Sequence, residues 1–421
     1  MLWACGQLNL TPPAGWLERF WEVSEGKLAS FTEQHFSNML YACALLNQSP
    51  PADWRERYWE VSESKLASFK EQGLSNTLWA CGQLGITPPA GWLERFWEVS
   101  EGKLASFKSQ ELSNTLYACG QLGITPPADW LHRFWEASED KLASFNEQNF
   151  SNTLYACGQL GITPPAGWMR EFWRASLPKL GQFKSQELSN SLYACGQLAL
   201  QPEPDWLLRF WEASEGKLHS FTPQGCANSL QAVAILKLWD CPVIGALWTK
   251  LNAAVASPSS PDHVLWACQL YQVHLVAETE RPGLLPPPGT EVLEFARDAW
   301  LKLANERRDE PSTRLHDSVS ACLTTTGVAH DNERWCEQSG HSIDIAIESG
   351  AHRIALEVDG PYHYLQNGQQ DGSTQLRNRM LRAHGWRVAV VDYRRWNALL
   401  SQPERSAYLK GLVAAAESDS S

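Results

Sequence analysis

Four side chains near the C-terminal end could carry out metal-assisted chemistry. Asp344, Glu357, Asp359 and His363 follow one another within a short segment. Three carboxylates and an imidazole could hold Mg²⁺, with Asp344 and Glu357 as candidate ligands, and activate a water for phosphodiester cleavage. We give more weight to the alternative that these acids serve structure or recognition. In that case no catalytic residue and no cofactor is expected.

A second group of residues is basic. Residues 374–396 contain several arginines and a single acid, Asp392. A local excess of positive charge of this kind is typical of contacts to phosphate groups. The arginines are Arg377, Arg379, Arg382, Arg387, Arg394 and Arg395.

A polar stripe recurs in the first half of the chain. Gln110, Asn114, Tyr117 and Gln121 have the spacing of one helix face. Amides can hydrogen-bond base edges, and an aromatic ring can stack on an unpaired base. For the asparagines, we give equal weight to a second interpretation, in which they form a hydrogen-bonded ladder between neighbouring helices instead of binding bases. The equivalent residues are Gln34, Asn38 and Tyr41; Gln72, Asn76, Trp79 and Gln83; Gln148, Asn152, Tyr155 and Gln159; and Gln186, Asn190, Tyr193 and Gln197.

Two positions beside each of these asparagines vary, as the specificity positions of a repeat code must. They lie three residues before and one residue after the asparagine, so they share a helix face. We therefore expect them to set the base preference. The first set is His35, Gly73, Glu111, Asn149, Glu187 and Gly225, and the second is Met39, Thr77, Thr115, Thr153, Ser191 and Ser229.

These side chains belong to a repeat that returns every 38 residues. Each repeat holds two apolar-periodic stretches, which predict a helical pair, and stacked pairs bury a continuous core. The fold class is therefore mainly α, an α-solenoid. We expect the repeated tryptophans and cysteines to pack between repeats rather than to bind ligands or metals. These rows are Trp16, Trp54, Trp92, Trp130, Trp168 and Trp206, and Cys5, Cys43, Cys81, Cys119, Cys157 and Cys195.

The boundaries within one repeat can be partly predicted. The first helix is expected from Gln110 to Leu122 and the second from Pro126, with Thr125 as its N-cap. The Lys-Leu-x-x-Phe segment that follows is left open: it is either a connector or an extension of the next first helix.

The chain changes pattern after the repeats. Helices are expected at 291–308, 315–324 and 374–384, and strands at 342–347, 353–358 and 387–391, which together predict a small α/β domain. The predicted parts are repeats at 1–240, a degenerate repeat or cap at 241–281, a Pro-rich linker at 282–290, a helical lead-in at 291–342, the α/β domain at 343–400, and a C-terminal helix and tail at 401–421.

Composition narrows the class of protein. The 421 residues carry a formal net charge of -12, which argues against a basic coat for nucleic acid and mildly favours a peptide-binding scaffold. No apolar stretch is long enough to predict a membrane span. The 11 cysteines form no CxxC pair, so we expect reduced thiols in the core.

Two resemblances emerge from these motifs. The 38-residue helical pair with Pro-Pro-x-x-Trp, as at Pro88 to Trp92, resembles the octotricopeptide repeat family of green algae and related organisms. The run from Leu356 to Pro361 with His363, followed by Gly385-Trp386, resembles the RAP domain, an RNA-binding module. That domain is also similar to restriction-endonuclease-like nucleases, although Asp359 stands where those enzymes carry the lysine that supports the attacking water.

The resemblance implies a sequence-specific protein for single-stranded RNA in organellar post-transcriptional gene expression, such as RNA processing, stability, splicing or translation. The chloroplast is the expected location and the mitochondrion the second choice, with other organellar RNA-processing proteins as partners. An endoribonuclease guided by the repeats and a peptide scaffold are the alternatives. Six or seven repeats would read about six or seven bases. Because the chain begins inside a first helix, we expect further repeats and a targeting peptide before it.

Overall fold

The computed structural model describes residues 1–257, 262–309, 313–350 and 352–418. It divides into two compact units, each described by itself. The first comprises Met1–Ala194 and Pro202–Ala213, and the second comprises Cys195–Gln201 and Ser214–Ser421.

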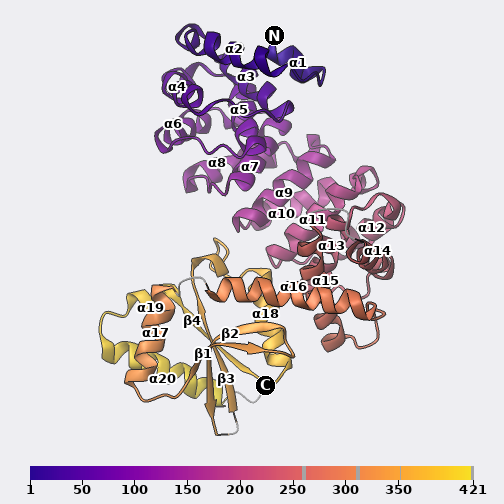
Figure 1. Cartoon of the computed structure of the whole chain (residues 1–421), viewed down its shortest axis with the longest axis vertical. Coiled ribbons are helices and arrows are strands. Elements are labelled where there is room, and N and C mark those ends of the chain that lie inside the picture. The colour runs from indigo at the N-terminus through magenta and orange to yellow at the C-terminus, as the bar shows by residue number, and fades with distance from the viewer. Residues whose placement is uncertain (258–261, 310–312, 351, 419–421) are drawn as a thin grey trace. The chain divides into compact units, whose positions relative to one another are not determined.

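The first unit is a stack of helical pairs (Figure 1), which confirms the predicted solenoid. The first helix of each pair packs against the first helix of the next, as α5 does against α3 and α7. Leu112, Leu116 and Cys119 of α7 are completely buried and form the predicted core face. The first helices are α1 (Leu2–Gln7), α3 (Glu33–Leu45), α5 (Glu71–Leu84), α7 (Ser109–Leu122), α9 (Glu147–Leu160) and α11 (Ser185–Gln197). The second helices are α2 (Ala14–Glu25), α4 (Ala52–Glu63), α6 (Ala90–Glu101), α8 (Ala128–Glu139), α10 (Ala166–Ser176) and α12 (Pro204–Glu215).

The first helices can approach one another closely because a glycine of one helix faces an alanine of the next at most contacts; α3 carries Ala44 in place of the glycine. A Cβ atom on Gly120 would lie 3.1 Å from the Cα of Ala156, and one on Gly158 would lie 3.0 Å from the Cα of Ala194. Real Cβ atoms rarely come so close, so a larger side chain would force the helices apart. The cysteines before these two glycines are buried, and no disulfide joins any of the 11 cysteines in the described structure. Burial raises the pKa of the Cys43 thiol to about 12.

The repeated tryptophans join the second helices, which confirms their predicted role in packing. The indole Nε1 of Trp130 donates a hydrogen bond to Ser100 Oγ of the preceding repeat at 2.9 Å, and both side chains are buried. The bond recurs between Trp54 and Ser24, Trp92 and Ser62, Trp168 and Ser138, and Trp206 and Ser176.

This bond predicts a specific loss of stability. Ser100→Ala would leave the buried Trp130 Nε1 without an acceptor and lower the free energy of unfolding by about 1–3 kcal/mol. The change would appear as a lower midpoint in urea unfolding followed by circular dichroism. Ser64→Ala, on an exposed hydroxyl, is the control and should shift stability by less than about 0.5 kcal/mol. Equal effects of the two variants would contradict the assignment.

The segment left open by the sequence is a short 3-10 helix with a lysine clamp. Lys103 Nζ, just before η3, donates to the carbonyl oxygens of Ala67 at 3.2 Å and Phe69 at 2.5 Å in the preceding repeat. Lys65, Lys141 and Lys179 bind the preceding repeat in the same way, so these lysines hold neighbouring repeats together. The 3-10 helices are η1 (Leu28–Ser30), η2 (Leu66–Ser68), η3 (Leu104–Ser106), η4 (Leu142–Ser144), η5 (Leu177–Gln182) and η6 (Leu218–Ser220).

The predicted cap of the second helix was wrong. α8 begins at Ala128, its N-cap is Pro127, and no side chain caps it, so Thr125 lies before the cap. Pro127 has an extended backbone with φ near -56° and ψ near 150°, so the helix begins two residues later than the threonine pattern suggests.

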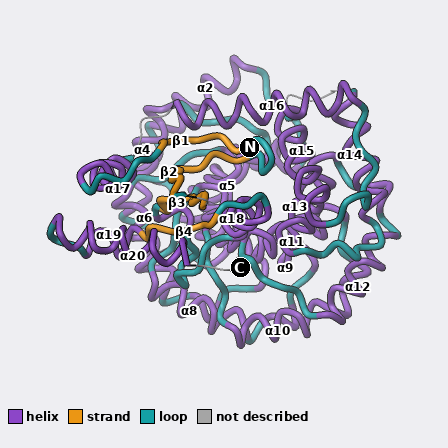
Figure 2. The backbone as a smooth tube through the Cα atoms, turned by 90° about the horizontal axis from the view of Figure 1, so that it is seen from below, coloured by secondary structure: helices purple, strands orange, loops and turns teal. Residues whose placement is uncertain are grey.

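The second unit combines helices with a four-stranded sheet. Strands β1–β4 lie in sequence order, as Figure 2 shows; β1 with β2 and β2 with β3 are antiparallel, and β3 with β4 is parallel. The helices are α13 (Pro223–Leu236), α14 (Ile244–Ala256), α15 (His263–Glu280), α16 (Thr290–Asp309), α17 (Arg314–Thr325), η7 (Pro361–His363), α18 (Gly372–Ala383), α19 (Tyr393–Ala398) and α20 (Gln402–Ser418). The strands are β1 (Asp331–Cys336), β2 (His341–Ser349), β3 (His352–Asp359) and β4 (Arg387–Asp392).

Strand β1 was not predicted from the sequence. Its residues are mostly polar and its outer half is exposed, because it forms an edge of the sheet. An edge strand with few apolar residues lacks the alternation by which a strand is recognised.

Each face of the sheet has its own core. Leu356, Val391 and Trp396 belong to a buried cluster with residues of α17 and α20. On the other face Ile343 and Ala355 pack with Leu381 of α18. The predicted α/β domain after the solenoid is therefore confirmed.

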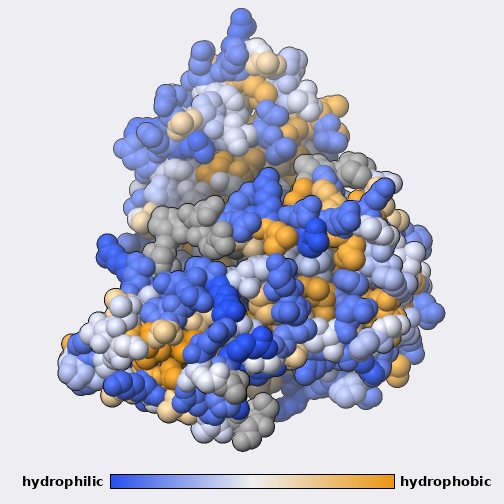
Figure 3. Space-filling view, turned by 60° about the horizontal axis from the view of Figure 1, so that its bottom comes forward, coloured by the Kyte–Doolittle hydropathy of each residue, from blue (hydrophilic) through white to orange (hydrophobic). Residues whose placement is uncertain are grey.

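No helix among the described residues is long and apolar enough to cross a membrane. Figure 3 shows hydrophilic side chains over much of the visible face, with hydrophobic residues in smaller areas between them.

Candidate nucleic-acid interface

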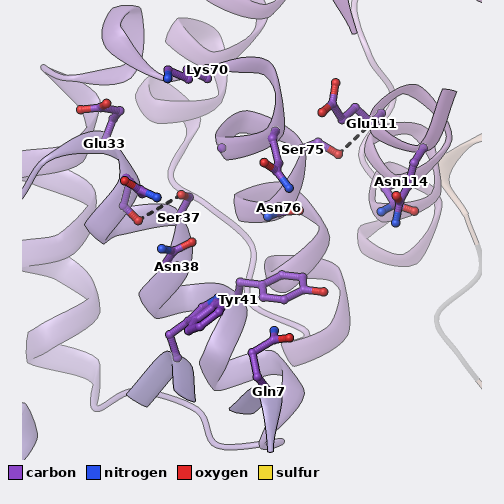
Figure 4. Close-up of a pocket in the computed structure, with 15 residues that line it drawn as sticks. Gln7, Glu33, Ser37, Asn38, Tyr41, Lys70, Ser75, Asn76, Glu111 and Asn114 are labelled. Carbon is purple, nitrogen blue, oxygen red and sulfur yellow. Dashed lines mark hydrogen bonds between the residues drawn. The ribbon is translucent and has the colours of Figure 1, made fainter. Parts of the chain in front are cut away.

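The predicted polar stripe lines an open pocket of about 530 Å³ across α3, α5 and α7 (Figure 4). Asn38, Asn76 and Asn114 contribute to its lining, and Tyr41 and Lys70 lie at its walls. The glutamines at the start of each helix, Gln34, Gln72, Gln110, Gln148 and Gln186, are exposed, whereas the asparagines and aromatic residues of the stripe are half-buried. The stripe is thus an accessible surface of the first unit.

The two interpretations of the amides apply to different rows. Gln83 Nε2 donates to Gln121 Oε1 of the next repeat at 2.8 Å, which is one step of a ladder. Among the residues that the structure describes, no hydrogen bond partner is found for the side-chain amides of Asn38, Asn76, Asn114, Asn152 and Asn190. The asparagines of the first unit therefore keep their donors and acceptors available, and Asn38, Asn76 and Asn114 present them to the open pocket.

The aromatic residues of the stripe contact one another in two stretches, α3 with α5 and α7 with α9 and α11. The ring centroids of Tyr41 and Trp79 are 5.1 Å apart, and those of Tyr117 and Tyr155, and of Tyr155 and Tyr193, are 6.2 Å apart. Burial raises the pKa of Tyr117 and Tyr155, so these phenols are uncharged at neutral pH. The row offers neutral ring edges beside the amides.

The variable position three residues before each asparagine has a structural role that was not predicted. It is the third residue of the first helix, and in four of the six repeats its side chain turns back to cap the helix start, whereas Gly73 and Gly225 have no side chain to do so. Glu111 accepts a hydrogen bond from the Lys108 backbone N–H at 2.7 Å, and Glu187 accepts one from Lys184 at the same distance. His35 and Asn149 cap their helices similarly, with Thr32 and Asn146. Asn149 also donates to Ser113 Oγ at 2.8 Å.

The second variable position is buried. Thr115 Oγ1 donates to the Glu111 carbonyl oxygen at 2.7 Å, and Thr77 and Ser191 form the same bond one turn back in their own helices. Both proposed code positions thus share a helix face, as predicted, but that face packs against the neighbouring repeat. Gly73 and Glu111 of the first set nevertheless line the pocket, together with Glu33 and Lys70 at the helix starts.

The capping role gives a testable result for Glu111. Glu111→Ala would leave the Lys108 N–H without its acceptor and lower the free energy of unfolding by about 1 kcal/mol. Chemical unfolding measures the change. Glu111→Gln keeps an acceptor oxygen and should restore most of the loss. A changed base preference in Glu111→Ala with unaltered stability would show instead that this residue reads RNA.

The polar row ends at the sixth repeat. Asn228, in α13 of the second unit, is buried, and its Oδ1 accepts hydrogen bonds from Gln224 at 2.7 Å and Gln269 at 3.3 Å. Gln269 also donates to Gln231 at 2.8 Å. This closed amide cluster gives Asn228, which lies 38 residues after Asn190, the hydrogen-bond partners that the earlier asparagines lack.

The acidic cluster of the α/β domain surrounds an arginine. Arg377 Nη2 of α18 lies 2.9 Å from Glu357 Oε2 and 2.9 Å from Asp359 Oδ1, and both acids are 0% exposed. Asp344 accepts a hydrogen bond from the Val358 N–H at 2.7 Å. His363 Nδ1 is 3.8 Å from Asp359 and 3.1 Å from Thr374 Oγ1. The structure thus brings all four candidate catalytic residues together around one guanidinium group.

The charge balance of this cluster shifts its pKa values. Burial raises the pKa of Glu357 well above its usual value, although Arg377 partly opposes this. Burial likewise raises the pKa of Asp359. A single guanidinium cannot fully compensate three carboxylates, so the pKa of Glu357 stays raised despite the ion pair.

The cluster does not have the arrangement of a Mg²⁺ site. The guanidinium lies where a cation would have to contact Glu357 and Asp359, and Asp344 is committed to a backbone amide. In the described parts of the chain no group of three His, Cys, Asp or Glu residues could hold a metal ion. These residues therefore form an ion-pair network rather than a metal cradle.

The six arginines of the basic segment do not form one surface. Arg379 bonds Glu280 at 2.6 Å and the carbonyl oxygens of Ala234 and Ile235, and Arg387 bonds carbonyl oxygens near the end of α20. With Arg377 in the acidic cluster, three of the six are used inside the protein. Arg394 is exposed but pairs with Asp392, Arg395 stacks on Tyr408, and Arg382 is exposed. A count of charges along the sequence could not reveal these partners.

Comparisons with known proteins agree with this architecture. The family described as RAP domain matches residues 356–412, and the family described as Tbc2 translation factor, N-terminal domain, matches residues 16–140 and 133–285. A protein of Oryza sativa subsp. japonica, "RAP domain-containing protein, chloroplastic", is 22% identical over 185 residues, which are 43% of this chain and 28% of that protein. The chain thus spans under a third of that relative. Because the Tbc2 match covers more than half of its residues, the chain belongs to the Tbc2 translation factor N-terminal domain family, and it carries a C-terminal RAP domain.

Proposed function

We propose that this protein binds single-stranded RNA in a sequence-specific manner along the first helices of its repeats. The observation that carries the proposal is the row of asparagine amides without protein partners beside a row of aromatic rings, most of which contact a ring of the neighbouring repeat. An amide offers a donor and an acceptor in one plane, which suits a base edge, and aromatic residues stack on bases of any sequence. RNA recognition by repeats uses this combination of side chains.

The ends of the same helices supply positive charge. Lys70, Lys108 and Lys184 stand exposed at the N-caps of α5, α7 and α11, where helix dipoles add positive potential. The clamp lysines of the 3-10 helices are already bonded to carbonyl oxygens. We therefore assign the phosphate contacts of the repeats to the N-cap lysines, and those of the RAP domain to Arg382, Arg394 and Arg395.

The number of repeats whose asparagine amide has no protein partner determines how many bases we expect the protein to read. The amide is open at Asn38, Asn76, Asn114, Asn152 and Asn190 but closed at Asn228. At one base per repeat, this chain should read about five bases, fewer than the six or seven inferred from the repeat count.

We place this activity in organellar post-transcriptional gene expression. The description of the rice relative as chloroplastic supports the chloroplast, with the mitochondrion as second choice. The family description as a translation factor favours translation among the proposed steps, which also include RNA processing, stability and splicing. Other organellar RNA-processing proteins are the proposed partners.

One selection experiment tests the proposal. The purified chain is incubated with a random single-stranded RNA pool, with and without Mg²⁺, and bound RNA and cut ends are sequenced. We expect an intact motif of about five bases, with affinity that falls steeply as salt rises. Cuts that need Mg²⁺ and vanish in Glu357→Gln would replace binding by endonuclease activity. The absence of any enriched motif would favour a peptide scaffold.

A further inference from the structure

The repeat that contains Asn228 keeps the polar residues of the groove but not their exposure. Its first helix, α13, carries Gln224 four residues before the asparagine, as the earlier repeats do. In those repeats each glutamine is exposed and each asparagine is half-buried, whereas Gln224 is half-buried and Asn228 is 8% exposed. The stacking of first helices nevertheless continues, because a Cβ atom on Gly196 of α11 would lie 3.0 Å from the Cα of Ala232 of α13. The amides of α13 are therefore covered by an added group rather than by altered stacking.

The covering group is an indole from α15, which packs beside α13 in the second unit. Trp266 Nε1 donates a hydrogen bond to Gln224 Oε1 at 2.9 Å, and the Trp266 side chain is buried. Gln224 Nε2 in turn donates to Asn228 Oδ1 at 2.7 Å. The glutamine of this repeat thus binds a flat heteroaromatic ring through the ring N–H. A nucleobase offers the same chemistry, because its edge carries N–H donors on a planar ring.

The place of Trp266 along its helix explains how it reaches the preceding repeat. Gln269 Nε2 of α15 donates to Asn228 Oδ1 at 3.3 Å, so Gln269 lies opposite the asparagine. Trp266, three residues earlier, takes the position that Glu111 holds in its own repeat. The Glu111 side chain turns back to the start of its own helix. The longer indole extends instead over the amides of the neighbouring helix.

We propose that Trp266 is a built-in substitute for a base, which occupies the base site of this repeat and ends the RNA footprint at Asn190. The inference rests on the proposed RNA-binding function and names the residue that determines where reading stops. No base reaches the α13 amides while the indole is bound to them. The equivalent amides of Asn76 and Asn114 line the open pocket of the first unit instead.

Selection from a random single-stranded RNA pool, with the intact wild-type chain and with Trp266→Ala, tests the inference. We expect a motif of about five bases for the wild-type chain and the same motif lengthened by one specified base for the variant. Two RNAs of equal length that differ only at this added base then measure the effect by fluorescence anisotropy. The variant should prefer the selected base about fivefold, the contribution of about one net hydrogen bond, and the wild-type chain should not distinguish the two RNAs.

Three further variants separate the blocked site from a loss of stability. Trp239→Ala removes another buried tryptophan of the second unit, whose Nε1 donates to Glu280, and should leave the motif unchanged. Trp266→Phe keeps an aromatic ring in place and should also leave it unchanged. Gln224→Ala tests the wild-type site without removing the indole: because Gln224 is bound to protein groups, its loss should not change RNA affinity. Circular dichroism at the assay temperature shows whether each variant is folded.

Other outcomes overturn the inference. An unlengthened motif in a folded Trp266→Ala variant would leave the tryptophan a purely structural role and the proposed function intact. A six-base motif for the wild-type chain, or weaker RNA binding by Gln224→Ala, would show that RNA displaces the indole from the site. The absence of an enriched motif for every protein would reject the proposed function, and the inference with it.

Discussion

Replacing Arg377 by methionine is expected to lower the free energy of unfolding by about 3–5 kcal/mol. The side chain fits the space, but the substitution leaves Glu357 and Asp359, both 0% exposed, beside Asp344 without a counter-charge. Removing one partner of a buried ion pair costs far more than the pair itself contributes. Thermal unfolding of the intact chain, followed by circular dichroism, measures the loss in the transition of the second unit.

The loss should depend on pH with a defined sign. Without Arg377 the pKa values of the buried acids rise further above their unfolded values, so the folded state takes up protons that the unfolded state does not. Stability is then retained below the unfolded pKa of about 4.5 and lost as pH rises through the folded pKa values. The variant should approach the wild-type protein near pH 5 and differ most at pH 8.

Two further variants decide whether charge is the cause. Adding Glu357→Gln and Asp359→Asn to the Arg377 variant removes the uncompensated charges and should recover most of the stability at pH 8. Arg382→Met changes an exposed arginine of the same helix and should have little effect. A loss in Arg377→Met that is the same at pH 5 and pH 8 would indicate packing rather than electrostatics.

Changing Asn76, Asn114 and Asn152 together to alanine should weaken binding of the selected RNA about 100-fold. Each amide is expected to contribute about one net hydrogen bond to a base, or about fivefold in affinity. The amides have no partners in the described protein, so their removal should leave the unfolding midpoint almost unchanged. Fluorescence anisotropy with labelled RNA at fixed salt measures the affinity.

The control variants remove polar side chains that lie outside the groove. Thr87→Ala and Thr125→Ala remove exposed, uncharged polar groups from the loops of the same region, away from the groove. They should leave RNA affinity unchanged. If the triple asparagine variant binds as tightly as the wild-type chain, the amide row does not contact RNA.

The sequence alone determined the repeat architecture. Its 38-residue period and the 3.6-residue spacing within each helix specify which side chains share a face, because helix geometry is local. Asn114 and Tyr117 were placed on one stripe for that reason, and the RAP domain was recognised from residues close together in the chain. Because the repeats share one pattern, a helix face predicted in one repeat is also predicted in the next.

Tertiary structure decided which of those faces remains open and which charges are free. Glu111 and Thr115 share a helix face with the spacing of a code, but both are buried, and the Glu111 carbonyl oxygen accepts a hydrogen bond from Ser75 of the preceding repeat. Arg377 was predicted to contact phosphate. In the folded protein it lies in α18 and pairs with Glu357 and Asp359 of β3. Burial and ion pairing depend on segments distant in sequence, and local periodicity contains no information about those partners.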